Sequence, residues 1–200
     1  ENSEVIEPSD IKEEGSVIFP VLHGPNGEDG TVQGLFEVLN MPYVGAGVLA
    51  SACAMDKIVA KQLFQQAGIP QLPYVSVIRR AYQEEPEKIY SQCEGTLIYP
   101  MFVKPANMGS SVGISKAESR AELTKAIEEA FRYDRRVIVE QGIEARELEV
   151  AILGNDEIRT TEAGEIVKDV AFYDYESKYI DNKVTLQVPA IVSDELHKKM

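Results

Sequence analysis

The segment formed by residues 101–114, MFVKPANMGSSVGI, limits the fold of this chain more than any other. Its first three residues are apolar and predict the end of a buried strand, which brings Lys104 and Pro105 to the strand exit. Small, turn-forming residues follow, leave backbone N–H groups uncovered, and include the hydroxyl donors Ser110 and Ser111. Such a loop can approach a phosphate chain closely, but a Gly/Ser hairpin lid without a ligand has the same composition. The segment lacks the G-x-x-x-x-G-K-[ST] pattern of a Walker A loop.

Composition excludes several classes of protein. No apolar run reaches the roughly 18 residues that a membrane-spanning helix needs, and Cys53 and Cys93 are too few for a disulfide framework. The net charge of −13 argues against a nucleic-acid partner, yet it permits a phosphate ligand because charges are screened over about 8 Å. We therefore expect no membrane contact, no nucleic acid and a reducing, cytoplasmic location. Because the sequence starts at Glu1 and stops at Met200 within a helical pattern, we interpret it as a segment of a longer protein.

Near the N-terminus, residues 17–22 predict a buried strand, and the acidic, Gly-rich sequence HGPNGEDG follows directly. An amphipathic pattern over residues 31–39 then predicts a helix, which completes a β-loop-α unit. Ligands gather at the carboxyl ends of strands in such units, so His23 and Glu28 are candidate site residues. In the alternative interpretation, His23 only ends the strand and Glu28 only complements the helix dipole.

A second helix is predicted to start at Asp56 and to stop at Gly68. Lys57 lies in its first turn, where a cation opposes the helix dipole. A nearby phosphate would explain this position, and so would an exposed lysine at a domain boundary. The small residues of 46–54 suit a close-packed connection between domains.

The remaining pattern alternates short strands and helices and predicts an α+β domain of the nucleotide-binding kind. Strands are expected at residues 73–79, 97–104, 137–140, 146–153, 165–170 and 184–188, and helices at 84–92, at 119–131 behind a capping box, and after Ser193. The tyrosine-rich segment 171–179 has no consistent period, and alone it would be an aromatic-anchored surface loop.

The order of five motifs resembles one family. HGPNGEDG, MDK, VKPANMGSSVG, VEQG and YDYESKY occur in the order typical of the D-alanine–D-alanine ligase family, whose members have an ATP-grasp fold. The resemblance extends from about residue 17 to residue 200. It implies three parts: the end of an α/β N-terminal substrate domain (residues 1–53), the central ATP-grasp domain (54–145), and the beginning of a truncated C-terminal lobe (146–200).

The resemblance also implies a role for each motif. Two lysines would contact the ATP phosphates, two serines would belong to the phosphate lid, one strand end would hold adenine, and a glutamate would bind the ribose hydroxyls. These residues are, in that order, Lys57 and Lys104; Ser110 and Ser111; Glu140, Gln141, Gly142 and Ile143; and Glu147. His23 and Glu28 would support the substrate pocket. Lys178 would reach the terminal phosphate, and Tyr179 with Ser110 would close the lid over D-alanine.

The implied reaction is the ATP-dependent joining of two D-alanines through an acyl phosphate, which supplies a peptidoglycan precursor. Mg²⁺ would be the second cofactor, with ligands expected beyond residue 200, so no metal ligand is assigned in this chain. The full-length protein would be a homodimer, and this chain alone would be incomplete for catalysis. Two alternatives remain: a D-alanine–D-lactate or D-alanine–D-serine ligase, and an ATP-binding scaffold without catalysis. The YDYESKY motif argues against a depsipeptide ligase, which would lack it.

Overall fold

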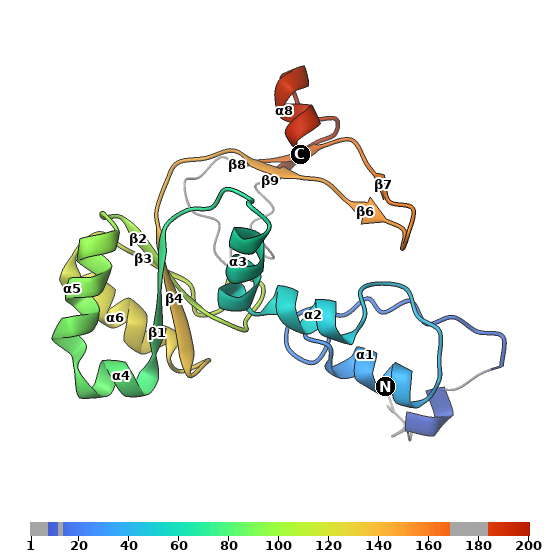
Figure 1. Ribbon diagram of the computed structural model, residues 1–200, viewed down its shortest axis with the longest axis horizontal. Coiled ribbons are helices and arrows are strands. Elements are labelled where there is room, and N and C mark those ends of the chain that lie inside the picture. Colours follow the sequence, from blue (N-terminus) through green and yellow to red (C-terminus); the bar gives the residue numbers. More distant parts are fainter. Residues whose placement is uncertain (1–7, 12–13, 169–183) are drawn as a thin grey trace. The chain divides into compact units, whose positions relative to one another are not determined.

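The computed structural model describes residues 8–11, 14–168 and 184–200, and the chain divides into two compact units, Glu1–Gly142 and Ile143–Met200 (Figure 1). The expected α+β class is confirmed, because both units combine helices with antiparallel strands. The division into three parts stays a prediction. No helix among the described residues has the length and apolar character needed to cross a membrane.

A four-stranded sheet forms the centre of the first unit. Its order is β1 (Tyr74–Ile78), β4 (Arg136–Gln141), β2 (Met101–Pro105) and β3 (Ser115–Ala117), and all neighbours are antiparallel. The β-branched residues of β1 and β4 suit a pleated, half-buried strand, and β4 lies inside the sheet while β1 forms one edge. The strands predicted at 73–79 and 137–140 are confirmed, whereas β2 starts four residues later than the expected residue 97.

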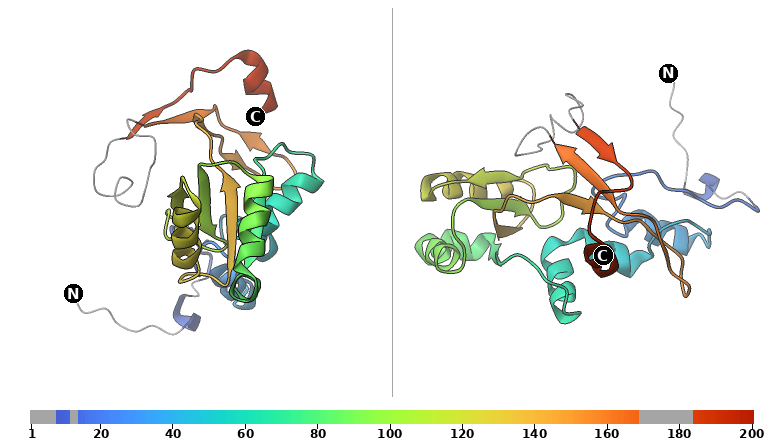
Figure 2. Two further views of the ribbon diagram at one scale, coloured as in Figure 1. Left: turned by 90° about the vertical axis from the view of Figure 1, so that its left-hand side faces the viewer. Right: turned by 90° about the horizontal axis from the view of Figure 1, so that it is seen from above.

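Alternation along these strands sends apolar side chains to one face, where the main core lies. Val77, Val103 and Val139 are fully buried there against α5 (Pro86–Thr96) and α6 (Arg120–Ala130). Figures 1 and 2 show these two helices together on one side of the sheet. Burying each large apolar side chain contributes about 1.5–3 kcal/mol to stability, so this core layer holds the two helices against the sheet. The structure adds a short helix that the sequence analysis missed, α4 (Arg79–Glu84).

Helix α3 (Lys57–Gln66) packs on the opposite face of the sheet (Figure 1). Its Ile58 contacts a small cluster with Ala106 and Ile138, and Tyr74 packs against that cluster. The helix begins as predicted, because the carboxylate of Asp56 accepts hydrogen bonds from the backbone N–H groups of residues 58 and 59. The same face also carries the charged side chains of Lys104, Arg136 and Glu140, and we call it the open face of the sheet.

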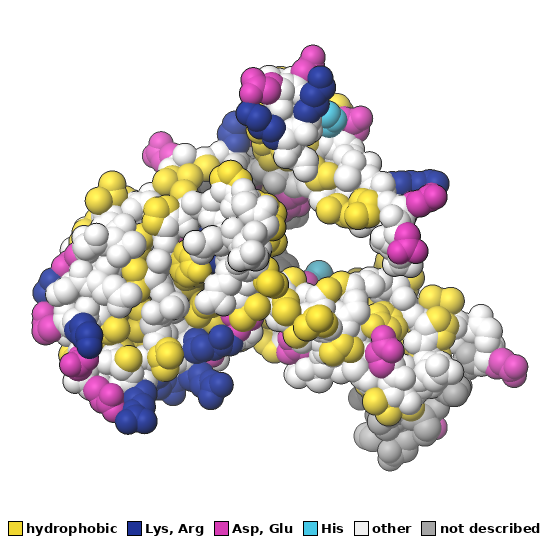
Figure 3. Space-filling model, in the orientation of Figure 1, with side chains coloured by type: hydrophobic (Ala, Val, Ile, Leu, Met, Phe, Trp, Pro, Cys, Tyr) yellow, Lys and Arg dark blue, Asp and Glu magenta, His cyan; other side chains and the backbone are white. Residues whose placement is uncertain are grey.

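The N-terminal part of the first unit contains η1 (Pro8–Ile11), α1 (Thr31–Val38) and α2 (Val48–Met55). The prediction of a buried strand at residues 17–22 is wrong. Only an isolated bridge joins Ile18 to Tyr43, and Phe19 and Val21 are 70% and 73% exposed. A strand is held by neighbours, and among the described residues this segment pairs only with the short piece around Tyr43. Hydrophobic side chains also lie on the surface over α2 (Figure 3), where Leu49 is exposed.

The second unit contains β5 (Glu147–Glu149), β8 (Gly164–Lys168) and β9 (Val184–Gln187) in one antiparallel sheet, and the hairpin of β6 (Ile152–Leu153) and β7 (Arg159–Thr160). The single strand expected at residues 146–153 is therefore split in two. Helix α8 (Asp194–Lys199) begins behind Ser193, whose hydroxyl accepts from the N–H of Leu196 at 3.2 Å, as predicted. The tyrosine-rich segment lies outside the described residues.

Candidate functional site

Lys57 lies at the start of α3 and faces the glycine-rich loop that follows β2. Its backbone N–H donates to the carbonyl oxygen of Ala106 at 3.0 Å, and its ammonium group donates to the carbonyl oxygen of Met108. Burial lowers the pKa of Lys57, and the nearby positive charge of Lys104 lowers it further, while the surrounding carboxylates act in the opposite direction. Lys57 and Lys104 thus converge on one place although 47 positions separate them in the sequence.

Lys104 reaches the same place from β2 and forms an ion pair with Glu140 of β4. The other carboxylate oxygen of Glu140 lies 2.8 Å from the ammonium nitrogen of Lys61. Burial would raise the pKa of Glu140, but the two ammonium groups lower it below its ordinary value of 4.5. Glu140 is therefore a buried carboxylate held in its charged form between two cations.

The loop after β2 is tied down at its beginning and strained in its middle. Both the backbone and the side-chain nitrogen of Asn107 donate to one carboxylate oxygen of Asp134, at 2.9 and 2.8 Å. Ser110 and Ser111 follow with φ values of 51° and 61°, a conformation that costs a non-glycine residue roughly 1–3 kcal/mol. Two adjacent strained serines beside a pair of lysines indicate a loop built to present its backbone to a ligand.

The HGPNGEDG loop contacts the middle of this glycine-rich loop. One carboxylate oxygen of Glu28 accepts from the backbone N–H of Gly24, and the other lies 4.0 Å from the ring nitrogen Nδ1 of His23. A Cβ atom placed on Gly109 would lie 3.6 Å from the Cα of Gly24 and 3.8 Å from Glu28 Oε2. The structure thus places Glu28 and the backbone of Gly24, which directly follows His23, beside Gly109 within the first unit.

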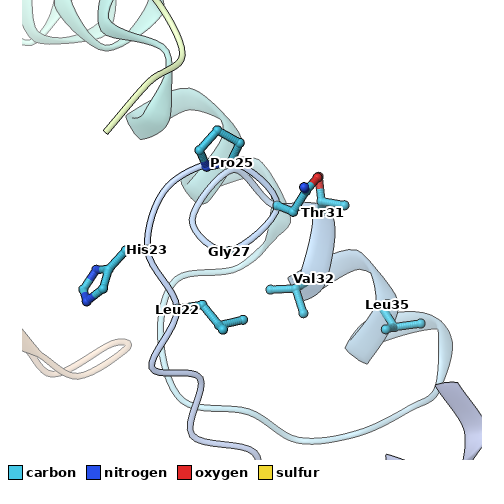
Figure 4. A pocket seen from close by; sticks show the side chains of 8 residues that line it. Leu22, His23, Pro25, Gly27, Thr31, Val32 and Leu35 are labelled. Carbon is cyan, nitrogen blue, oxygen red and sulfur yellow. The ribbon is translucent and has the colours of Figure 1, made fainter. Parts of the chain in front are cut away.

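An apolar cavity of about 370 Å³ lies on the other side of the same loop. Leu22 and Val32 point toward each other in Figure 4, whereas the ring of His23 points away from them. The cavity is lined by Leu22, His23, Pro25, Asn26, Gly27, Thr31, Val32 and Leu35. Its lining has few polar groups and no lysine, so it is separate from the site of Lys57 and Lys104.

The end of β4 is fixed against the segment that precedes β2. The side-chain amide of Gln141 accepts from the backbone N–H of Ile98 at 2.8 Å and donates to its carbonyl oxygen at 2.9 Å. The N–H of Gly142 donates to the carbonyl oxygen of Pro100 at 2.9 Å. Any Cβ at Gly142 would lie 2.5 Å from that oxygen, so only glycine fits. The predicted adenine residues therefore begin on a rigid strand end.

Two further predicted residues belong to the second unit: Ile143 is exposed, and Glu147 lies on β5. Lys178 and Tyr179 lie outside the described residues. The sequence analysis missed Lys61 and Asp134. The signal for Lys61 was its spacing, because residues at i and i+4 share a helix face and Lys57 was already a candidate. Within the described part of the chain, no group of three His, Cys, Asp or Glu side chains could hold a metal ion.

Comparison with known proteins identifies the family to which this geometry belongs. The model of the C-terminal part of D-ala D-ala ligase matches residues 63–200, and the model of its N-terminal part matches residues 1–46. The chain belongs to the D-ala D-ala ligase family. The ATP-grasp fold predicted from the sequence is thereby confirmed.

Curated members of the D-ala D-ala ligase family resemble this chain over nearly its whole length. The D-alanine–D-alanine ligase of Enterococcus hirae is 67% identical over 98% of this chain and 54% of its own length. That of Enterococcus gallinarum is 65% identical over 97% of this chain and 61% of its own length. The crystal structure of the VanG D-Ala:D-Ser ligase from Enterococcus faecalis is similar with a TM-score of 0.79 and 40% identity, covering 92% of this chain and 52% of that one. The chain spans about half the length of the relatives that it matches.

Proposed function

We propose that this chain is the ATP-binding part of a cytoplasmic D-alanine–D-alanine ligase, an enzyme that forms D-alanyl-D-alanine and ADP for peptidoglycan precursors. The observation that carries the proposal is the convergence of Lys57 and Lys104 beside the glycine-rich loop, on the open face of the sheet. Identity of 65–67% to curated D-alanine–D-alanine ligases supports the reaction, and the 40% identity to a D-Ala:D-Ser ligase gives less support to that alternative.

The residues present fit a nucleoside triphosphate. A triphosphate needs cations and uncovered backbone N–H groups, and the site offers Lys57, Lys104 and the loop of residues 107–113. Each lysine contributes a Coulomb term of about 4 kcal/mol at 4 Å in an effective dielectric of 20, before desolvation is subtracted. The described residues do not assemble a ligand set for Mg²⁺, so we assign none of them to a metal.

Both lysines have partners within the chain, and each must leave its partner when the phosphates bind. Lys57 must leave a neutral carbonyl oxygen, whereas Lys104 must leave the carboxylate of Glu140. A charged phosphate oxygen is a stronger acceptor than a carbonyl, so the exchange of Lys57 is favourable. Loss of the Lys57 contact to Met108 also frees the loop, which can then close over the phosphates and exclude water from the reacting carboxylate.

The HGPNGEDG loop would support the substrate. Glu28 accepts from the N–H of Gly24, which lies beside Gly109, and the side chain of the preceding His23 is exposed. These residues would therefore position the D-alanine carboxylate close to the lid that covers the phosphates. Lys178 and Tyr179 would act on the terminal phosphate and the lid, and a homodimer is our expectation for the full-length protein.

Nucleotide binding can be tested on this chain directly. Titration calorimetry with ATP should give a millimolar or tighter dissociation constant, and Lys104→Ala should weaken it. Lys88→Ala is the matched control, because Lys88 lies on the solvent side of α5 and pairs with the exposed Glu85. A folded chain that binds no ATP at millimolar concentration would refute the nucleotide site.

The reaction is tested on the full-length protein by ADP release with D-alanine alone and with D-serine or D-lactate as competitors. A preference for D-serine or D-lactate as the second substrate would replace the proposed activity by one of the two alternatives. ATP binding without any ligation would favour the other alternative, an ATP-binding scaffold without catalysis.

A further inference from the structure

Glu140 and the two lysines beside it form a cluster with more positive than negative charge, which we name the Glu140 cluster (Lys61, Lys104 and Glu140). Each carboxylate oxygen has its own cation, Oε1 that of Lys61 and Oε2 that of Lys104. The Glu140 side chain is 11% exposed, so water replaces little of what the cations provide. The proposed nucleotide site uses Lys57 and Lys104 and gives Lys61 no role.

The two lysines of the Glu140 cluster are held differently. Lys61 lies in the middle of α3, its side chain is 16% exposed, and its ammonium nitrogen is 5.2 Å from the centre of the Tyr74 ring. Lys104 lies near the end of β2 beside the glycine-rich loop, and its side chain is 28% exposed. Lys61 is therefore held by its position on α3 and by its contact with the Tyr74 ring. Lys104, in contrast, faces the proposed phosphate position.

A single lysine could not serve both Glu140 and a phosphate without penalty. If Lys104 were the only cation, its movement to a phosphate oxygen would leave a buried carboxylate without a partner. Breaking a buried ion pair in this way is strongly destabilising, because the remaining charge is not compensated. With Lys61 on the other oxygen, Glu140 keeps one full ion pair when Lys104 departs.

We propose that Lys61 is a positioning residue that keeps Glu140 neutralised, so that Lys104 can exchange from Glu140 to a phosphate oxygen of the bound nucleotide. The inference rests on the proposed function and adds a residue to it. Lys61 acts through Glu140 and touches no phosphate. Its effect falls on the part of binding that requires Lys104 to move. Any contact of Glu140 with adenine is common to ATP and adenosine, so it cancels in the ratio of the two affinities.

The test compares ATP with adenosine, since only ATP requires the exchange. In Lys61→Met, ATP should bind about tenfold more weakly, as expected for partial loss of a buried ion pair. Adenosine should bind within about twofold of the parent, because Lys104 stays on Glu140 when no phosphate is present. Lys61→Arg preserves the cation and should restore the ratio of the two affinities. Both ligands are measured by titration calorimetry or ligand-detected NMR on the 200-residue chain.

A double variant shows whether the effect passes through Glu140. Glu140→Gln removes the charge that Lys61 neutralises, so adding Lys61→Met to it should leave the ratio of ATP to adenosine affinity unchanged. If the ratio changes as much in this background as in the parent, Lys61 acts independently of Glu140 and the inference is wrong. Lys88→Met is the matched control for loss of one positive charge, and it should not change the ratio.

Three outcomes separate this inference from the proposed function. Normal ATP binding with an unchanged ratio in Lys61→Met would refute only the role of Lys61, and an equal loss for ATP and adenosine would do the same. Absence of any ATP binding to the parent would refute the nucleotide site itself and the inference with it. Should Lys61→Met fail to fold, a structure of the parent with ATP decides: Lys61 must still contact Glu140 and Lys104 must contact phosphate. Lys104 found on Glu140 would overturn the inference.

Discussion

Asp56 joins helix α3 to the sheet in two ways, so its replacement can separate the two contributions. One carboxylate oxygen caps the helix by accepting from the N–H groups of Ile58 and Val59, at 3.1 and 3.0 Å. The other oxygen forms an ion pair with Arg136 of β4. The Asp56 side chain is 7% exposed and that of Arg136 is 32% exposed.

The expected magnitudes follow from these contacts. Loss of an N-cap costs about 1 kcal/mol. Breaking a buried ion pair costs about 3–5 kcal/mol, but water reaches Arg136, so we reduce this part to about 1–2 kcal/mol. Asp56→Ala should therefore lower the free energy of unfolding by about 2–3 kcal/mol, and Asp56→Asn, which keeps an oxygen for the cap, by about 1–2 kcal/mol.

Urea unfolding followed by far-ultraviolet circular dichroism measures these differences. Ser119→Ala is the matched control, because Ser119 caps α6 by accepting from the N–H of Glu122 and has no ion pair. It should cost about 1 kcal/mol. If Asp56→Ala is no more destabilising than Ser119→Ala, the pair with Arg136 contributes nothing and the reasoning fails.

Three further predictions concern other buried groups. Burial would raise the pKa of Glu140, but two ammonium groups hold it below 4.5. The contribution of Glu140 to the free energy of unfolding is therefore present above pH 4.5 and is lost as the pH falls through the pKa of the folded state. Urea midpoints measured at decreasing pH should fall less steeply in Glu140→Gln than in the parent, and equal slopes would contradict this. Burial raises the pKa of the Cys93 thiol to about 11, so iodoacetamide at pH 8 should label Cys53 and reach Cys93 only after unfolding, as mass spectrometry of peptides would show. Gly142→Ala places a Cβ against the Pro100 carbonyl and should lower the free energy of unfolding by about 1–3 kcal/mol, measured by urea unfolding. An unchanged urea midpoint would show that the backbone at the end of β4 moves to make room for the Cβ.

Local signals predicted the elements whose ends are chemically marked. Asp56 and Ser119 start α3 and α6 where the capping rules place them. The strand predicted at residues 17–22 is not formed, because a continuous apolar run shows only that a buried strand would be favourable where neighbouring strands are available. Helix α2 was missed because its small residues have no marked apolar period and suit a connection equally well.

In the candidate site too, features within one segment were predictable from the sequence, whereas contacts between distant segments were not. The lysines and the glycine-rich loop were predictable, because each is unusual in its own segment. The pairing of Glu140 with two lysines was not, since the spacing of Lys57 and Lys61 indicates a shared helix face but does not indicate that this face packs on β4. Likewise, Asp134 anchors Asn107 across 27 positions, and nothing in either segment indicates the contact.

The two ion pairs between α3 and β4 have opposite polarity, and this specifies how the helix lies on the sheet. At its start the helix offers Asp56 to Arg136, and five residues later it offers Lys61 to Glu140.

Reversing the helix on the sheet would bring two carboxylates together at one end of α3 and two cations together at the other. Like charges in a partly buried interface are unfavourable, so the two pairs select one direction of packing. That direction places the N-terminus of α3 beside Ala106 and Met108, and therefore places Lys57 at the loop. The cation that opposes the helix dipole is tolerated there because Asp56, directly before it, supplies the negative charge that the helix start favours.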